Sequence, residues 1–210
     1  LNRDHPLAEK RNGIMKMESS RCMGGAEITT YDSLDHSLGQ ARHNLYLSVK
    51  GWASYVALCA LFKELGLKNK AEQAHACAKL SAASITANFN DKTGFIPAVF
   101  EGDNKSAIIP AIEALVYPYE MGLHEALDIG GEFRDLLEKL SGHFDNILKK
   151  GICLYEDNGW KLSSSADNSW MSKICLCMYV ARKIMGKKFS DELLYDKAHW
   201  NWQTQGESAY

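Results

Sequence analysis

The sequence predicts an all-α fold in which the helices form two concentric layers, as in an α/α toroid or part of one. Strongly apolar segments alternate with amphipathic ones along the chain, which is the pattern of buried inner helices and half-exposed outer helices. Short β-like excursions separate the helix pairs. No repeat of fixed length is present, and a general helical bundle is the alternative that the same pattern allows.

Length and charge narrow the class of protein. The 210 residues are 46% hydrophobic, which is enough for one domain with a real core. The 24 basic and 26 acidic side chains give a net charge of -2, so no basic surface for nucleic acid is expected. No uninterrupted apolar run approaches the roughly 20 residues that cross a bilayer, and no membrane partner is expected. Most of the six cysteines lie in apolar helical patterns, which suits free thiols in the cytoplasm.

The clearest expected helix covers residues 36–65. Its apolar side chains recur at steps of three to five residues, close to the period of one buried helix face. Asp35 or Ser37 is expected to cap its start, and Gly66 is expected to end it.

Further helices are expected along the rest of the chain. A short link around Gly66 places the second helix antiparallel to the first, and its small residues allow close approach. The expected ranges are 68–89, 108–123 with a break at Pro118, 131–149 and 167–186, followed by a short helix after Ser190 and an aromatic, polar end at 199–202.

Two excursions between helices have β-like sequences. The first contains the run 95–100 between Gly94 and Gly102, which suits a small hairpin or an extended loop. The second covers residues 151–162, with Asp157-Asn-Gly159 as its turn.

Asp32 and Asp35 are the first chemical candidates, because they lie where a loop gives way to the first helix. Helix capping is the ordinary role of such residues. Glycoside hydrolysis, however, uses two carboxyl groups beside the scissile bond. A carboxyl close to another carboxylate has a raised pKa, which suits a general acid. Both roles remain open at this stage.

Asp167, Asn168 and Trp170 form a second candidate group at the start of another helix. Asp167 as an N-cap is the simpler reading. The alternative is that these side chains bind sugar. Inner helices of a toroid run in one direction, so the N-termini of 36–65 and 167–186 would share one rim.

Other residues are weaker candidates for a functional site. Glu113 and Glu120 lie on an expected inner helix, where a buried acid needs a partner and one of them could line a cavity. Trp160, Trp200 and Trp202 are candidates for stacking on sugar rings, although aromatic residues are more often core. The sequence contains no metal-ligand spacing and no phosphate loop, so neither a cofactor nor a metal is expected.

Several sequence blocks resemble the glycoside hydrolase family 52 β-xylosidases. They are Ile28-Thr-Thr-Tyr-Asp-Ser-Leu-Asp, Ser37-Leu-Gly-Gln-Ala-Arg, Asn44-Leu-Tyr-Leu, Ala166-Asp-Asn-Ser-Trp-Met-Ser-Lys-Ile and Asp196-Lys-Ala-His-Trp-Asn-Trp. They occur in order over nearly the whole chain. The resemblance implies an N-terminal β-sandwich followed by an (α/α)6 barrel, of which residues 1–210 would be the C-terminal part.

The resemblance also implies retaining hydrolysis that removes xylose from the non-reducing end of xylo-oligosaccharides or from aryl β-xylosides. The acid/base aspartate of the family lies in a segment similar to Thr30-Tyr-Asp32, so the role falls to Asp32, with Asp35 as second choice. Tyr31 and Arg42 lie in the same blocks and are expected to contact substrate, together with Asp167, Asn168 and Trp170.

The chain departs from the family in length, since the β-sandwich and the first part of the barrel are not matched. The nucleophile glutamate belongs to that part, so the chain is expected to be a fragment with little activity of its own. Its partner would be the N-terminal part of the same enzyme or another chain, including a second copy in a homodimer. The alternatives are a non-catalytic helical assembly module, or a related α/α-toroid β-glucosidase.

Overall fold

The computed structural model describes residues 44–100, 103–167, 169–191 and 193–205. Every regular element among these residues is a helix. Pairing of β type is limited, in the same residues, to isolated bridges between single residue pairs. The prediction of an all-α fold is confirmed.

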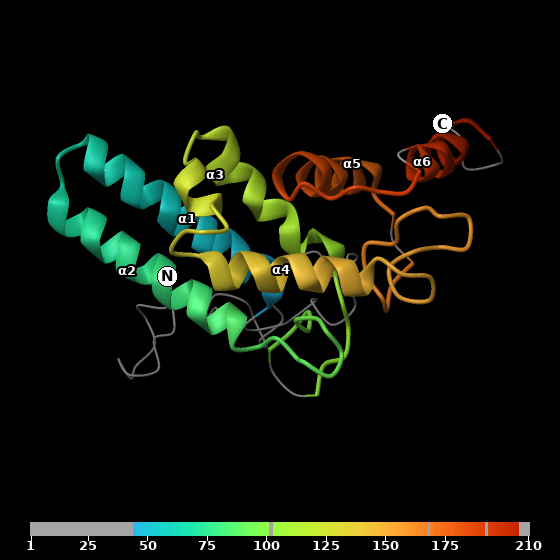
Figure 1. Cartoon of the computed structure of the whole chain (residues 1–210), viewed down its shortest axis with the longest axis horizontal. Coiled ribbons are helices and arrows are strands. Elements are labelled where there is room, and N and C mark those ends of the chain that lie inside the picture. The colour runs from blue at the N-terminus through green and yellow to red at the C-terminus, as the bar shows by residue number, and fades with distance from the viewer. Residues whose placement is uncertain (1–43, 101–102, 168, 192, 206–210) are drawn as a thin grey trace, which may run out of the picture.

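Helices α1 (Leu45–Glu64) and α2 (Lys68–Thr86) form an antiparallel hairpin (Figure 1). Gly66 turns the chain between them with a φ of 69°, a left-handed conformation that glycine adopts without steric cost. Both the stop after α1 and the short link are therefore confirmed. The buried face of α2 is made mostly of small side chains, which let the two helices approach closely: Ala71, Ala74, Ala78, Ser81, Ala82 and Ile85.

The start of α1 differs from the expectation. Its N-cap is Asn44, whose side chain accepts a hydrogen bond of 2.8 Å from the backbone N–H of Leu47. Asn44 has extended backbone angles and pairs with Val99 in an antiparallel bridge, so the chain enters the helix from an extended segment. The prediction that Asp35 or Ser37 caps this helix is wrong; both lie outside the described residues.

Helix α1 is more apolar than the sequence analysis predicted. Its 20 residues include a window with a mean hydropathy of 1.4, which is long and apolar enough to span a membrane by length and composition. Half of that window is buried within the protein, against α2 and the segment η4 described next. A buried core helix meets the same criterion, because it too is apolar on several sides.

The middle of the chain is a run of short helices. The 3₁₀ segment η4 (Ile109–Leu115) is buried at all of its residues, and it continues into α3 (Val116–Glu120) and then, after a turn, η5 (His124–Leu127). The expected break at Pro118 is wrong. Pro118 is the third residue of α3, which continues through it to Glu120, and a proline is tolerated in the first turn of a helix.

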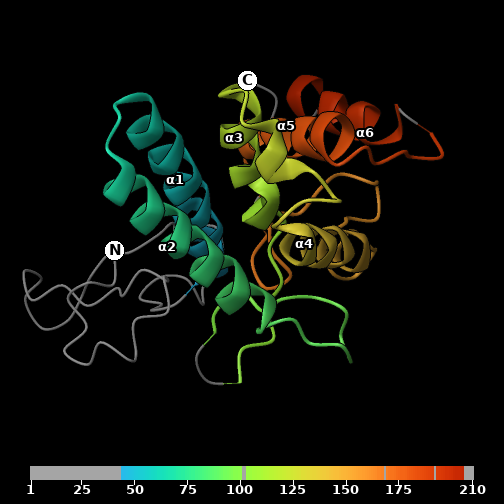
Figure 2. The ribbon, with the colours of Figure 1, turned by 60° about the vertical axis from the view of Figure 1, so that its left-hand side comes forward.

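The C-terminal half contains α4 (Arg134–Ile147), α5 (Met171–Tyr179), the π-helical segment η6 (Val180–Ile184) and α6 (Leu194–Thr204). Helix α4, whose position is seen in Figure 2, contacts α2 and η4, and its buried residues are apolar apart from His143. Helix α5 begins four residues later than expected, with Trp170 at the N-cap position, so the prediction of Asp167 as its cap is wrong. His199 and Trp202 lie within α6 rather than beyond a helix.

The excursion at 151–162 folds back on itself as predicted. Leu154 and Trp160 form an antiparallel bridge, and the N–H of Tyr155 donates to the carbonyl of Gly159 at 2.9 Å. Asn158 at the tip has a φ of 72°, so the predicted turn at 157–159 is confirmed. The first excursion closes through a bridge between Asn90 and Phe95.

His143 of α4 fastens the first excursion to the core. Its ring is fully buried. Its Nδ1 accepts a 3.1 Å hydrogen bond from the N–H of Ile96, and its Nε2 lies 2.9 Å from the carbonyl oxygen of Ile108. The ring must therefore be neutral, with the proton on Nε2. Burial lowers the pKa of His143 to about 4, which keeps it in that form.

The buried η4 segment joins several helices of the described chain. Helices α1 and α5 both contact η4, whereas α2 packs on α1, and α4 packs on α2 and η4. The arrangement in two concentric layers, and the toroid that they would form, remain predictions.

Candidate functional site

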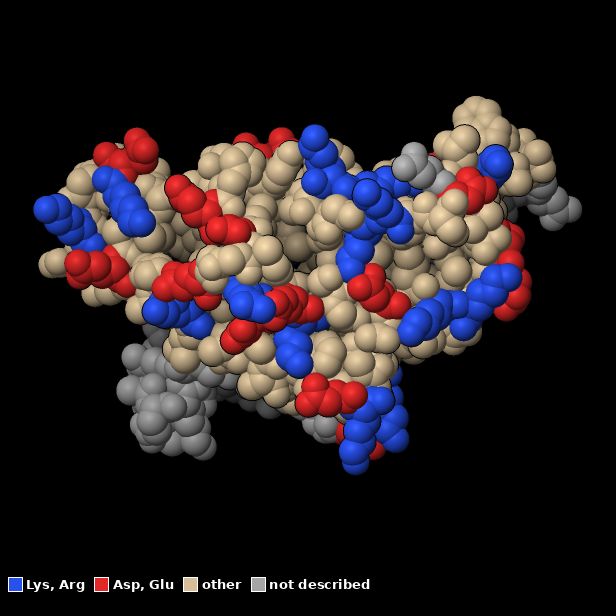
Figure 3. Space-filling view, in the orientation of Figure 1, with Lys and Arg blue, Asp and Glu red and all other residues tan. Residues whose placement is uncertain are grey.

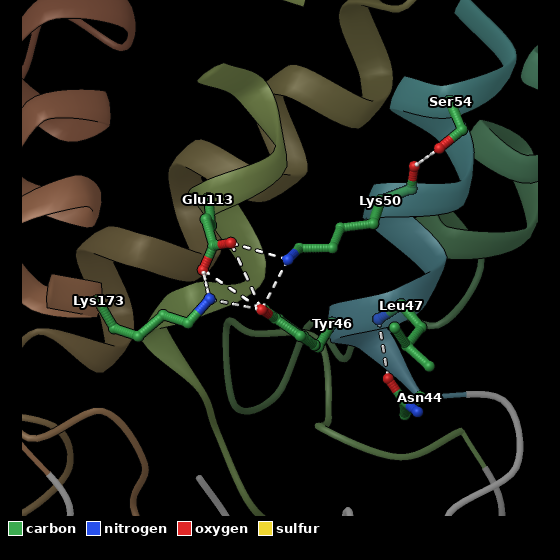
Figure 4. A network of polar contacts seen from close by, with 7 residues as sticks. All are labelled: Asn44, Tyr46, Leu47, Lys50, Ser54, Glu113 and Lys173. Carbon is green, nitrogen blue, oxygen red and sulfur yellow. Dashed lines mark hydrogen bonds and ion pairs between the residues drawn. The ribbon is translucent and has the colours of Figure 1, made fainter. Parts of the chain in front are cut away.

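The central polar feature of the described chain is a buried carboxylate held by two lysines. Glu113 of η4 is only 2% exposed. Its Oε1 lies 2.8 Å from the Nζ of Lys50, and its Oε2 lies 2.6 Å from the Nζ of Lys173 (Figure 4). A buried carboxylate without partners would be strongly destabilising, so the two ammonium groups account for its presence in the core.

Tyr46 completes this cluster. Its phenolic oxygen accepts hydrogen bonds of 2.7 Å from both Lys50 and Lys173, and its hydroxyl lies 3.4 and 3.5 Å from the two oxygens of Glu113. We call these four residues, Tyr46, Lys50, Glu113 and Lys173, the Glu113 cluster. Each of its members contacts at least two of the others, so the loss of one side chain disturbs the rest.

Three separate elements supply the Glu113 cluster. Tyr46 and Lys50 are one turn apart in the first turns of α1, and an i, i+4 spacing places two side chains on the same helix face. Lys173 lies in the first turn of α5, and Glu113 comes from η4 between them. The starts of α1 and α5 therefore lie close together, joined by the 2.7 Å hydrogen bond from Lys173 to Tyr46, while the shared rim of a toroid remains a prediction.

In this cluster, the hydrogen bonds and charges together affect the pKa of each lysine more than burial does. Burial on its own would lower the pKa of Lys173, but its hydrogen bonds to Glu113 and Tyr46 outweigh that effect, and the pKa is raised. The pKa of Lys50 is raised for the same reasons. Both lysines therefore stay protonated at neutral pH, although their side chains are only 26% and 15% exposed.

The sequence analysis placed Glu113 and Glu120 together on an inner helix, where a buried acid needs a partner, and of the two only Glu113 is buried and paired; that either of them lines a cavity remains a prediction. The other acid of that pair, Glu120, is exposed and accepts a 2.7 Å hydrogen bond from Tyr179. Lys50 and Lys173 were missed. Each is a single basic residue within an otherwise apolar helical run, and such a residue is a signal for a buried acidic partner.

Asp167 and Trp170, expected to bind substrate, lie directly before α5. Asp167 forms a 3.0 Å ion pair with Lys161 of the second excursion and is 80% exposed on its side chain. Trp170 is 40% exposed, and its backbone carbonyl accepts the first hydrogen bond of α5 from Ile174. Both are accessible to a ligand, and substrate contact remains a prediction for each.

The three tryptophans considered for sugar stacking differ in exposure. Trp160 is fully buried and packs among Phe144, Phe189 and Tyr195, so that prediction is wrong for Trp160. Trp200 is 67% exposed on α6. Trp202 is half-buried and donates from its indole N–H to Asp157 at 2.6 Å.

The remaining predicted site residues lie outside the described part of the chain. These are Tyr31, Asp32, Asp35, Arg42 and Asn168. Within the described residues, no group of three His, Cys, Asp or Glu side chains could hold a metal ion, and the five described cysteines are free thiols. The face shown in Figure 3 carries basic and acidic side chains interspersed.

Comparison with known proteins gives a relationship over the whole chain. No family model matches the sequence. A β-xylosidase of Geobacillus stearothermophilus is 50% identical over 209 residues, which cover 100% of this chain and 28% of that protein. A second β-xylosidase of the same organism is 35% identical over 88 residues, which are 42% of this chain and 14% of that protein.

An identity of 50% sustained over 209 residues implies common descent and a shared local fold. The chain spans 28% of the length of the first relative, so the likeness concerns one part of that enzyme. Over its full length, the chain is therefore a homologue of part of a β-xylosidase.

Proposed function

We propose that the chain is part of a retaining β-xylosidase that releases xylose from the non-reducing end of xylo-oligosaccharides. The observation that carries this proposal is the 50% identity over 209 residues to a β-xylosidase. The resemblance of residues 28–35 and 166–174 to family 52 supports the narrower assignment, because those blocks contain the residues expected at the site.

In this proposal Asp32 is the general acid/base. As a carboxylic acid it protonates the departing glycosidic oxygen while a glutamate nucleophile attacks the anomeric carbon. As a carboxylate it then takes a proton from the water that hydrolyses the xylosyl-enzyme. Asp35 is the second choice for this role. No glutamate of this chain is assigned as the nucleophile.

The positions of the substrate contacts follow from the same proposal. Tyr31, Arg42 and Asn168 are assigned to the sugar by their place in the resembling blocks. Asp167 and Trp170 precede α5 directly, and the first turn of α5 is joined through Glu113 to the second turn of α1, which contains Lys50. This junction supports a single site, since the two sets of proposed contacts lead into helices that meet.

The test uses the complete gene product that contains this chain, because the chain matches 28% of its relative. Wild-type protein should hydrolyse an aryl β-xyloside. The Asp32→Ala variant should lose turnover on xylobiose by about 10²- to 10⁴-fold, the usual contribution of general acid–base catalysis. On an activated aryl xyloside, added azide should restore turnover and yield xylosyl azide.

Asp35→Ala is the matched control, since it removes a carboxylate three positions away in the same segment. Equal losses for both variants on all substrates, without rescue by azide, would contradict the role of Asp32. Faster hydrolysis of the aryl β-glucoside than of the xyloside would replace the proposed substrate with that of a β-glucosidase.

A second candidate function is supported by one observation, an apolar stripe on α1. Leu58, Leu61 and Leu65 are 37%, 50% and 61% exposed, and their spacing places them on one face of the helix. Exposed apolar patches mark interaction surfaces. In a non-catalytic assembly module this stripe would bind a second copy or another chain. Light scattering measures the mass of the particle in solution. A stable monomer would contradict the assembly role.

A further inference from the structure

We infer that an open pocket between the second excursion and helix α6 binds a xylose unit of a xylo-oligosaccharide. Its volume of about 480 Å³ lies within the range of ligand sites. The inference rests on the proposed function for the class of sugar, whereas the pocket itself is formed by described residues. We call it the Trp202 pocket, and it is lined by Tyr155, Glu156, Asp157, Ser169 and Trp202.

The Trp202 pocket adjoins residues that the proposed function assigns to the sugar. Ser169 in its lining directly precedes Trp170 in the chain. Asp167, two residues before Ser169, forms a 3.0 Å ion pair with Lys161 of the second excursion. The Nζ of Lys161 also lies 5.9 Å from the centre of the Tyr155 ring in the pocket wall. Contacts therefore join the segment before α5 to the wall of the pocket.

Two aromatic rings form a corner of the pocket. Tyr155 and Trp202 meet edge to face, with ring centres 5.5 Å apart and planes at 82°. Both side chains are half-buried, so part of each remains accessible to a ligand. The C–H groups of a pyranose ring form an apolar surface that can pack against such rings, while its hydroxyl groups need hydrogen-bonding partners. The corner therefore suits a ligand that is apolar on its faces and polar at its edge.

The pocket also supplies acceptors for sugar hydroxyl groups. Asp157 accepts from the N–H of Gly159 at 2.9 Å and from the indole N–H of Trp202 at 2.6 Å. A carboxylate offers about four acceptor positions, so it can accept further bonds. Glu156 is 87% exposed, and its Oε2 lies 3.4 Å from the Nζ of Lys150. Hydrogen bonds from hydroxyl groups to these carboxylates would be charge-assisted and strong.

Trp202 is held in a fixed position before any ligand binds. Its indole N–H is bonded to Asp157, and its ring packs on His199 with centres 5.2 Å apart. A Cβ at Gly159 would overlap the ring, so glycine at this position allows the close approach. A fixed wall lowers the entropy cost of binding. Trp200, two residues away on α6 and 67% exposed, is not part of the lining and provides a matched control.

The experiment observes the two tryptophans directly by fluorine NMR of the complete protein labelled with fluorinated tryptophan. The Trp202→Phe and Trp200→Phe variants assign the two signals. The probe is xylotriose with sulfur in place of the glycosidic oxygens, which resists hydrolysis, so the readout does not depend on turnover. We expect the Trp202 signal to shift in a saturable way as the probe is added, while the Trp200 signal stays in place.

A substitution at an exposed acid tests the contribution of the carboxylates without disturbing the core. Glu156→Gln should raise the Kd obtained from the Trp202 signal by about 10- to 100-fold, the usual effect of losing a hydrogen bond to a charged group. Glu138→Gln is the control, since Glu138 is an exposed acid of α4 that pairs with Arg134 and does not line the pocket. It should leave the Kd unchanged.

The failures of the two proposals are distinguishable, because hydrolysis of an aryl β-xyloside is measured separately. Hydrolysis without a shift of the Trp202 signal, or with an equal shift of the Trp200 signal, leaves the proposed function intact and overturns the inference. A shift at Trp202 without hydrolysis of the xyloside contradicts the proposed function and supports the pocket as a xylose site. Aromatic rings beside carboxylates can also bind cations. An equal shift with choline that high salt abolishes would identify a cation site and overturn the inference.

Discussion

Glu113 and His143 are two buried titratable groups that the same small core accommodates in opposite ways. Glu113 is paired with two lysines at 2.8 and 2.6 Å, whereas His143 is neutral and bonded to backbone groups of Ile96 and Ile108. The ion pairs of Glu113 place three charged and largely buried side chains where α1, η4 and α5 meet. The hydrogen bonds of the neutral His143 ring hold the backbone at Ile96 and Ile108 in place and add no charge. The difference separates a region suited to organise a site from one suited to hold the fold.

The largest effect is expected from removing the charge at the centre of the first region. Glu113→Ala leaves two half-buried ammonium groups without their shared carboxylate, and breaking a buried pair from one side costs about 3–5 kcal/mol. We expect the free energy of unfolding in urea to fall by that amount. Replacing Lys50 and Lys173 by Met together with Glu113→Gln should cost less, since no buried charge then remains.

A loss for Glu113→Ala no larger than that for an exposed pair such as Arg134–Glu138, which is worth less than about 1 kcal/mol, would contradict this reading. Arg134→Ala is a suitable reference, because its pair is an exposed i, i+4 contact within α4.

His143 should make the protein less stable in acid. Its pKa is lowered to about 4 in the fold by burial, from the ordinary 6.5. The unfolded chain therefore gains a proton below about pH 6.5, while the folded chain resists protonation down to about pH 4. Stability should fall as pH decreases through this window, by roughly 3 kcal/mol in total from this group. Unfolding curves in urea between pH 7 and 4 measure it.

The control for that slope is His143→Gln, which can still accept from the N–H of Ile96 but cannot titrate. This variant should be less stable than the wild type at pH 7 and should lose less stability toward pH 4. Identical slopes for the two proteins would show that other groups cause the acid sensitivity.

A third prediction concerns the close contact between Gly159 and Trp202, which involves no buried charge. A Cβ at Gly159 would lie 1.9 Å from an atom of the Trp202 ring, so Gly159→Ala must push the indole away and strain its 2.6 Å hydrogen bond to Asp157. Overpacking of this kind costs about 1–3 kcal/mol. Thermal unfolding, with fluorescence of the tryptophans as readout, should show a destabilised C-terminal region.

The smallest effect has the opposite sign. Gly51 lies inside α1, and a Cβ there would meet no atom within 4 Å. Gly51→Ala should therefore raise the free energy of unfolding by about 0.5–1 kcal/mol, because alanine loses less conformational freedom in a helix. A destabilised variant would mean that the stripe of α1 near Gly51 is covered by another part of the protein.

The helical elements could be predicted from the sequence because apolar periodicity and Gly66 are local signals. The ends of helices could not. The start of α1 depends on Asn44 pairing with Val99, which is 55 positions away in the chain, and α5 begins after Trp170 rather than after the acidic residue nearby. Caps chosen from residue type alone were wrong at both places, and at α1 the helix begins where Asn44 pairs with Val99.

The candidate site could be predicted only in part, because some of its signals are local in the sequence and others depend on tertiary packing. The need of Glu113 for a partner follows from its place in an apolar run. The identity of the partners does not, since Lys50 and Lys173 lie 63 and 60 positions away and meet only through packing of η4 between α1 and α5. The acid/base role of Asp32 comes from the resemblance of residues 28–35 and remains a proposal.

The most direct test of the central claim is the anomeric form of the first xylose released by the complete protein, followed by proton NMR during the first minutes of hydrolysis of an aryl β-xyloside. Retaining chemistry through a xylosyl-enzyme and the proposed acid/base predicts β-xylose first, with α-xylose appearing later by mutarotation. Initial release of α-xylose, or no release of xylose, would contradict the proposed function.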